Sequence, residues 1–210
     1  MANAFLTIAT TPSVVAAQAA NGSAGLYDKV GGQRPSDRLG EAEAAFIAAR
    51  DSFYMASVSE TGWPYVQHRG GPPGFLRVID ETTLAFADFH GNRQYISLGN
   101  VMANDRVALF LMDYPNRRRL KIYARIEARD LPADAGLAAA LDLAGHRAVP
   151  ERAFVLKVEA FDWNCPQHIT RRFSESEATA AAAPLQARLA ELEFQNAAMR
   201  KALAERGISL

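Results

Sequence analysis

The chain has 210 residues, 49% of them hydrophobic and 22% charged, which is enough for one substantial domain with an additional segment. Its 23 basic residues balance its 23 acidic residues, so no overall basic field attracts a nucleic acid or an anionic membrane. Cys165 is the single cysteine, which excludes an internal disulfide framework. The sequence has no apolar run of about 18 residues and no basic leader, so we expect a cytoplasmic protein.

The first 40 residues are predicted to form an N-terminal helical arm. Thr11 and Pro12 are a typical N-cap and first-turn pair, and Asn21 with Gly22 is the matching stop signal, so we expect a helix over residues 12–21. A second helix is predicted over residues 41–51, EAEAAFIAARD, where the main domain of residues 41–173 begins.

The main domain then becomes rich in β-branched and aromatic residues arranged in short segments between turns. Residues 120–128 alternate strictly between apolar and polar, which is typical of a strand with one buried face. The predicted strands are residues 53–59, 63–69, 75–80, 83–89, 106–113, 120–128 and 153–161. Because tight turns join most of them, they favour an antiparallel barrel over a parallel α/β sheet. Two helices, over residues 92–103 and 132–145, are predicted to interrupt the strands.

The last segment, residues 184–206, has a heptad pattern. Its a and d positions are Leu185, Leu189, Leu192, Asn196, Met199 and Leu203. An asparagine at an a position is typical of coiled coils that specify their own register, so we predict a C-terminal coiled-coil helix. Two and a half heptads are marginal alone, so it would add to a dimer that the barrel already makes. The alternative is an amphipathic helix packed on its own domain, because periods of 3.5 and 3.6 residues cannot be separated over so short a run.

The stretch ADFHGNRQYISLGN, residues 87–100, is the first candidate binding site. Asp88 ends a strand, Gly91 supplies a turn, Asn92 and Arg93 lie where the next predicted helix begins, and Ser97 follows one turn later. Unpaired amides at a helix N-terminus and an adjacent guanidinium are suited to binding a phosphate. The alternative is an ordinary capped and solvated loop.

The stretch YVQHRGG, residues 65–71, is the second candidate. Strand alternation places Gln67 and Arg69 on one face and His68 on the other, so this strand end offers an amide and a cation together. The alternative is a solvated surface strand. His68 has no serine or carboxylate at a motif spacing, which leaves a nucleophilic triad unsupported.

Two further clusters flank the predicted strands: one precedes the strand at 120–128 and the other follows the strand at 153–161. Arg117, Arg118 and Arg119 open the first of these strands, but no aromatic stacking motif accompanies them, so one phosphate or one flavin edge fits better than RNA. Trp163, Cys165 and His168 follow the second strand. A cysteine and a histidine alone do not make a metal site, so we expect no metal, and we expect the indole to close over a planar ligand.

The order of these elements resembles the pyridoxamine 5'-phosphate oxidase-like flavoproteins, the FMN-binding split-barrel superfamily. The resemblance runs from about Glu41 to Arg172, and its most specific parts, DSFYMASVSETGWPYVQHRGGPPGFLRVID, TLAFADFHGNRQYISLGNVMANDRVALFLMD, RLKIYARIEA and DWNCPQHI, look like the branch described as predicted flavin-nucleotide-binding proteins. It implies a mainly β, α+β fold, a six-stranded antiparallel split β-barrel that forms a homodimer with FMN between its subunits. The cofactor-binding residues predicted in this way, with Trp163 added from its position, are Gln67, His68, Arg69, Asp88, Asn92, Arg93, Gln94, Ser97, Arg119 and Trp163.

The resemblance also implies an FMN-dependent oxidoreductase of unknown substrate. The flavin would do the redox chemistry, so no catalytic side chain is assigned, and a nicotinamide nucleotide would bind only transiently because no Gly-x-Gly-x-x-Gly fingerprint is present. The oxidases have an arginine at the position of Gln67 and a serine-arginine-lysine run at Asn92–Gln94. Their C-terminal signatures for pyridoxal phosphate have no counterpart, so we do not expect pyridoxamine phosphate oxidase activity. The alternative is a protein that binds or senses a flavin, a deazaflavin or haem without turnover.

Overall fold

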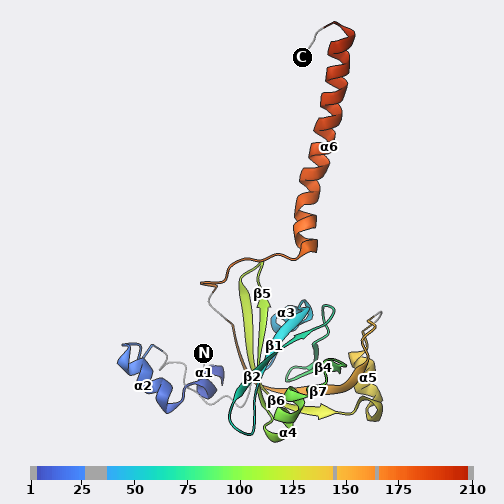
Figure 1. Ribbon diagram of the computed structural model, residues 1–210. Helices are drawn as coiled ribbons and strands as arrows, with labels where there is room; N and C mark the ends of the chain where they lie inside the picture. Colours follow the sequence, from blue (N-terminus) through green and yellow to red (C-terminus); the bar gives the residue numbers. More distant parts are fainter. Residues whose placement is uncertain (1–3, 27–36, 144–145, 164–165, 208–210) are drawn as a thin grey trace. The chain divides into compact units, whose positions relative to one another are not determined.

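Seven strands form the body of the protein: β1 (Ser52–Val58), β2 (Pro64–Gly70), β3 (Arg77–Asp80), β4 (Thr83–Phe89), β5 (Arg106–Asp113), β6 (Arg118–Arg129) and β7 (Pro150–Trp163). They make one antiparallel sheet in the order β2-β1-β5-β6-β7-β4-β3 (Figure 1). Each strand overlaps a predicted segment, with bounds that differ by up to three residues, and the α+β class is confirmed. The resemblance implied six strands, and the sheet has one more, because the short strand β3 pairs with β4 as an additional edge strand.

This computed structural model describes residues 4–26, 37–143, 146–163 and 166–207. The chain divides into two units. The first contains Met1–Asp113 and Arg117–His168 and includes the whole sheet. The second contains Tyr114–Asn116 and Ile169–Leu210, which includes the C-terminal helix.

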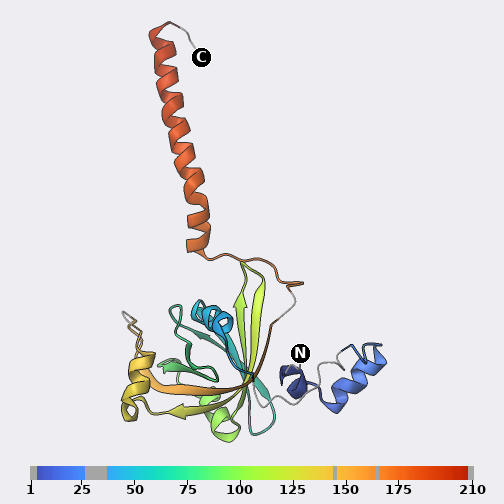
Figure 2. The same ribbon diagram turned by 180° about the vertical axis from the view of Figure 1, so that it is seen from behind.

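The sheet curls around an apolar core. Phe53 on β1 contacts Phe86 on β4 edge to face, with ring centroids 5.2 Å apart, although three strands separate β1 from β4 in the sheet order. Opposite views in Figures 1 and 2 both show the strands bending around this space. Leu120, Ile122 and Ile126 of β6 are buried there, as their alternation predicted. Burial of each such side chain contributes about 1.5 to 3 kcal/mol.

Among the described residues before the sheet there are three helices, α1 (Ala4–Ala9), α2 (Pro12–Ala20) and α3 (Glu41–Ala48). The boundaries of α2 follow the predicted signals, because the Thr11 side chain accepts a hydrogen bond from the Val14 amide and Asn21 is the C-cap. The helix predicted over 41–51 is α3. No periodicity predicted α1, whose Phe5 stacks on Tyr123 of β6 at a centroid distance of 4.4 Å.

The helices between strands are shorter than predicted. Helix α4 (Ile96–Ala103) begins four residues after the predicted start at residue 92, because the Asn92 side chain accepts a hydrogen bond from the Gln94 amide and closes a turn. A 3-10 turn, η2 (Leu131–Ala133), contains the proline predicted to open the next helix. Helix α5 (Ala135–Leu141) begins later because Asp134 caps the Leu137 amide at 2.9 Å. The predicted stop at Gly145 lies outside the described residues.

The second unit contains one long helix, α6 (Glu175–Glu205). It begins nine residues before the predicted segment, because Ser174 and Glu177 form a capping box ahead of an alanine-rich stretch and Pro184 is accommodated inside the helix. None of its described residues is buried. Among the helices that the structure describes, none is both long enough and apolar enough to cross a membrane.

Candidate functional site

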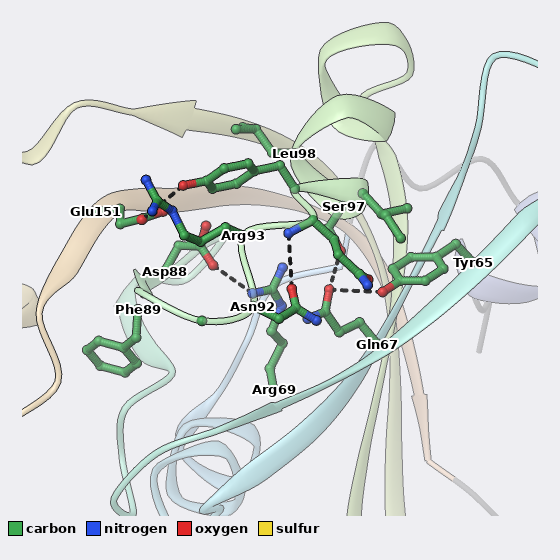
Figure 3. A pocket seen from close by; sticks show the side chains of 14 residues that line it. Tyr65, Gln67, Arg69, Asp88, Phe89, Asn92, Arg93, Ser97, Leu98 and Glu151 are labelled. Carbon is green, nitrogen blue, oxygen red and sulfur yellow. Dashed lines mark hydrogen bonds and ion pairs between the residues drawn. The ribbon is translucent and has the colours of Figure 1, made fainter.

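A pocket of about 140 Å³ lies between β2, the end of β4 and the loop that leads into α4 (Figure 3). Most of the predicted cofactor residues line it, namely Gln67, Arg69, Asp88, Asn92, Arg93, Gln94 and Ser97. The other lining residues are Tyr65, Phe89, Gly91, Tyr95, Ile96, Leu98 and Glu151. The two stretches that the sequence marked as separate candidates therefore form one site.

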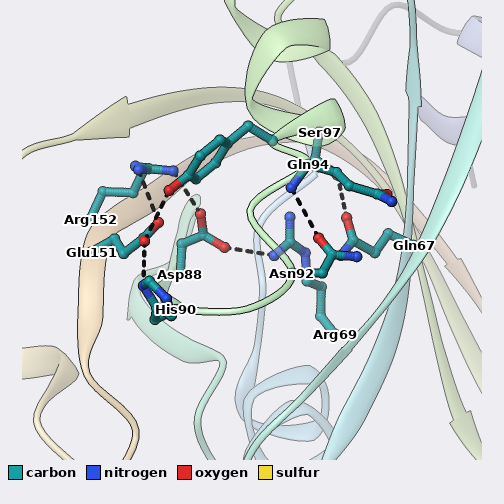
Figure 4. Close-up of polar contacts among 10 residues, drawn as sticks. Gln67, Arg69, Asp88, His90, Asn92, Gln94, Ser97, Glu151 and Arg152 are labelled. Atoms are coloured by element: carbon teal, nitrogen blue, oxygen red, sulfur yellow. Dashed lines mark hydrogen bonds and ion pairs between the residues drawn. The ribbon is translucent and has the colours of Figure 1, made fainter.

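Asp88 is held between two guanidinium groups (Figure 4). Arg69 Nη1 donates to Asp88 Oδ1 at 2.6 Å, and Arg152 Nη1 donates to Asp88 Oδ2 at 3.1 Å. The side chain of Asp88 is 9% exposed and that of Arg69 is 14% exposed, so water screens this pair weakly. Arg69 also lies over the rings of Phe86 and Phe154, 5.7 and 5.6 Å from their centroids. These contacts fix the Arg69 guanidinium at the inner wall of the pocket.

Gln67 joins β2 to α4. Ser97 Oγ donates to Gln67 Oε1 at 2.8 Å, and Tyr65 OH donates to the same oxygen at 3.4 Å. Ser97 is only 2% exposed, so the main role of its hydroxyl is this hydrogen bond between α4 and β2. As the alternation predicted, Gln67 and Arg69 share the face that lines the pocket.

The loop before α4 supplies hydrogen-bond donors. Arg93 and Tyr95 both have a left-handed backbone, with φ of 62° and 53°. Each costs about 1 to 2 kcal/mol for an L-residue, so the rest of the site must hold this loop in place. Tyr95 is the N-cap of α4 but its side chain caps no amide, which leaves first-turn N–H groups at the positive end of the helix for another acceptor.

The donors of the site fit the phosphate group of FMN. Arg93 is exposed at the pocket and forms no ion pair with another described residue. Arg69 Nε is buried and, within the described part of the chain, has no hydrogen-bond partner. Asp88 and Glu151 together balance Arg69 and Arg152, so Arg93 supplies the net positive charge at the pocket. A phosphate here would accept charge-assisted hydrogen bonds, which are the strong kind.

Glu151 closes one side of the pocket with three contacts. Its Oε1 lies 2.8 Å from His90 Nδ1 and 3.1 Å from Tyr95 OH, and its Oε2 accepts from Arg152 at 3.1 Å. Desolvation pushes the pKa of Glu151 upward, but the hydrogen bonds from Tyr95 and His90, with the charge of Arg152, outweigh it and hold the pKa below its usual value. Glu151 therefore stays ionised and positions both Tyr95 and Arg152.

Three predicted cofactor residues lie outside this pocket. His68 points to the opposite face of β2, where its ring meets Tyr54 edge to face at 5.6 Å. Arg119 lies over the Phe110 ring at 5.5 Å. Trp163 donates through Nε1 to Glu43 at 2.8 Å and stacks under Arg118 at 4.5 Å. The structure thus separates these three from the residues that line the pocket.

The predicted loop of Trp163, Cys165 and His168 falls partly outside the described residues, which do not include Cys165. Within the residues described, no group of three or more histidine, cysteine, aspartate or glutamate side chains is placed to hold a metal ion.

Sequence reasoning missed Tyr65, Tyr95, Glu151 and Arg152. Tyr65 and Tyr95 lie inside the two quoted stretches, and their proximity to polar residues was the available signal. Glu151 and Arg152 follow Pro150 at the start of β7. Arg152 meets Asp88 because the two residues are directly opposite in the pairing of β4 with β7. This pairing joins segments 64 residues apart, and no local pattern in the sequence specifies it.

Comparison with known proteins gives a family match. The family model described as pyridoxamine 5'-phosphate oxidase matches residues 39–165, which is more than half of the chain. None of the curated proteins matches significantly. Similar solved structures include HupZ of Group A Streptococcus, with 15% identity over 64% of this chain and 99% of that chain and a TM-score of 0.47. An FMN-binding protein from Syntrophomonas wolfei has 14% identity over 60% of this chain and 84% of that chain, with a TM-score of 0.46. General Stress Protein 26 of Bacillus anthracis has 11% identity over 57% of this chain and 88% of that chain, with a TM-score of 0.43.

Proposed function

This chain belongs to the pyridoxamine 5'-phosphate oxidase family, and from that premise we propose that it is an FMN-dependent oxidoreductase that works as a homodimer. The observation that carries the proposal is the convergence of Arg69, Arg93 and the uncapped start of α4 on one pocket. These groups are donors and cations, which is the chemistry that a phosphate requires.

The size of the pocket supports binding by the phosphate end of the cofactor. A volume of about 140 Å³ is below the roughly 300 to 1,000 Å³ of a typical small-molecule site. The pocket therefore accommodates one end of FMN, and the remainder needs surface beyond it. A second copy of the chain is the source of that surface in our proposal.

The outward face of β1 and β2 supports the homodimer. Tyr54 is 41% exposed and Val66 is 60% exposed on this face, and Trp63, just before β2, is 76% exposed. Tyr54 and Ala56 stand opposite His68 and Val66 in the strand register, so they form one continuous patch. β2 is also an edge strand of the sheet. Exposed apolar patches of this kind mark interaction sites. In the homodimer α6 also associates with the second copy of α6.

Bound FMN supplies the electron or hydride transfer, and the protein supplies binding, orientation and control of water. Arg93 and the first turn of α4 would hold the phosphate. Arg69 is fixed by Asp88 and by two aromatic rings, so it would stabilise negative charge without having to reorganise. The substrate is a small molecule, with a nicotinamide nucleotide as a transient electron donor. We place this activity in the cytoplasm, which suits a chain with one cysteine.

Comparison of FMN with riboflavin tests the proposal, because the two differ only by the phosphate. We expect FMN to bind the purified protein at least about tenfold more tightly, since loss of one charge-assisted contact costs about 1.5 to 3 kcal/mol. Titration of each compound, followed by quenching of flavin fluorescence, gives both dissociation constants. Equal affinities would show that the pocket does not recognise the phosphate.

A further inference from the structure

Helix α6 carries an apolar stripe along one face. We call this stripe the α6 seam, and it consists of Leu185, Leu189, Leu192, Asn196, Met199 and Leu203. Leu185 is 73% exposed, Leu189 57% and Met199 60%. No described residue of α6 is buried. Spacings of four and three residues alternate along the seam, which is the a/d pattern of a coiled coil.

We propose that the α6 seam pairs with the α6 seam of a second copy as a parallel, in-register, two-stranded coiled coil. This inference rests on the proposed homodimer, because two and a half heptads are marginal unless another contact brings the helices together. It adds the orientation and the register of the two helices. The orientation and the register are determined by three side chains, Asn196, Arg188 and Glu193.

Asn196 selects the parallel in-register arrangement. It occupies an a position between Leu192 and Met199, and in a parallel in-register pair each a residue faces the same residue of the other helix. The two amides then hydrogen-bond to each other. In an antiparallel pair an a residue faces a d residue, so Asn196 would lie against leucine or methionine. Within its own helix Asn196 Oδ1 accepts a hydrogen bond from Arg200 Nε at 2.8 Å, but the amide N–H groups would have no partner there. An unsatisfied buried donor costs about 1 to 3 kcal/mol, which disfavours that arrangement.

The charges beside the seam select the same arrangement. Arg188 is at a g position and Glu193 is at the e position of the following heptad. In a parallel pair, g of one helix lies next to this e of the other, so two symmetric Arg188–Glu193 pairs form across the interface. An antiparallel pair places g next to g and e next to e, so neither Arg188–Glu193 ion pair can form.

The contact that Arg188 makes within its own helix does not prevent this pairing. Arg188 lies 2.5 Å from Glu191, but the two side chains are 58% and 54% exposed. Ion pairs this exposed to water contribute little, so Arg188 can exchange Glu191 for Glu193 of the second copy. Pro184 is at a c position, off the seam, and directly precedes the first seam leucine.

Disulfide cross-linking of the full-length chain tests the orientation. In a Cys165→Ser background, Leu185→Cys and Leu203→Cys are made separately, with Lys201→Cys at an outward f position as the control. Under mild oxidation we expect both seam variants to form covalent dimers and the control to stay monomeric on a denaturing gel. An oxidised mixture of the two seam variants should give no mixed dimer. A mixed dimer, or cross-linking no stronger than that of the control, would overturn the proposal.

A charge exchange tests the register. Arg188→Glu, added to the Leu203→Cys variant, should slow cross-linking several-fold because like charges then face each other across the interface. Addition of Glu193→Arg should restore the rate, and no restoration would contradict the assigned pairing. FMN content is measured in the same samples. Normal FMN content without cross-links refutes the coiled coil alone, whereas cross-links without FMN refute the proposed function alone.

Discussion

Arg69 Nη1 lies 2.6 Å from Asp88 Oδ1, and this ion pair joins β2, the first strand in the sheet order, to β4, the sixth. No backbone pairing joins these two strands within the described residues. The sheet therefore closes on itself through side chains. The candidate site occupies this opening between β2 and β4, where polar groups are not used by a strand ladder and can face a ligand.

Asp88→Ala should destabilise the fold strongly, because it leaves Arg69 and Arg152 without their shared carboxylate. Removal of one member of a buried ion pair costs about 3 to 5 kcal/mol, and both guanidiniums here are mostly buried. Urea denaturation measures the change in the free energy of unfolding. Glu81→Ala is the matched control, since its pair with Arg38 is largely exposed, and it should leave the free energy unchanged within error. Equal effects of the two substitutions would contradict the closing role of Asp88.

Arg93→Ala should weaken FMN binding by about 10- to 150-fold, the equivalent of about 1.5 to 3 kcal/mol for a charge-assisted contact. The matched control is Arg117→Ala. Arg117 is also exposed and also has a left-handed backbone, with φ of 54°, but it does not line the pocket. Fluorescence titration of FMN into each variant makes the comparison. If both variants bind FMN like the unmodified protein, Arg93 does not contact the phosphate.

The ionisation of Glu151 makes the free energy of unfolding depend on pH. Its pKa is lowered in the folded protein, so the stabilisation that it provides is complete above the ordinary carboxyl pKa of about 4.3 and is lost as the pH falls through the lower folded value. The Glu151→Gln variant cannot titrate at this position. We expect its free energy of unfolding to fall less steeply than that of the unmodified protein between about pH 5 and pH 3. Identical slopes would contradict the assigned network around Glu151.

Truncation after Ala181 should leave a folded dimer. No described residue of α6 is buried and the main core cluster contains no residue of α6, so the core is complete without the helix, and the proposed barrel interface remains. Light scattering of the truncated protein gives its mass, and circular dichroism reports whether the sheet persists. A folded monomer would show that α6, rather than the face of β1 and β2, is the main contact.

The strands were predictable because their signals are local. Alternation at Leu120, Ile122 and Ile126, and turn residues between segments, fix where strands begin and end without reference to the rest of the chain. The start of α4 was not predictable in this way. Its first predicted turn is replaced by left-handed residues at Arg93 and Tyr95, and only the surrounding site offsets the cost of that backbone.

The site was predictable in part for the same reason. Gln67 and Arg69 share a face because strands alternate, and the loop at Asn92 and Arg93 has the composition of an anion site. That these two stretches meet in one pocket follows from the curl of the sheet. The family resemblance implied this meeting, but the residue patterns alone do not specify the curl. Arg152 was missed because its role depends on pairing between β4 and β7 across 64 positions of sequence.

The most direct test of the central claim is an absorbance spectrum of the purified full-length protein after incubation with FMN and removal of the excess. Acid release and chromatography then identify the bound compound. We predict the two flavin bands in the blue and near ultraviolet, with FMN in the supernatant and about one FMN per chain, since the described residues of each chain form this pocket. A colourless protein, or one that retains riboflavin as readily as FMN, would contradict phosphate-directed FMN binding, and a haem spectrum would favour a binding or sensing role.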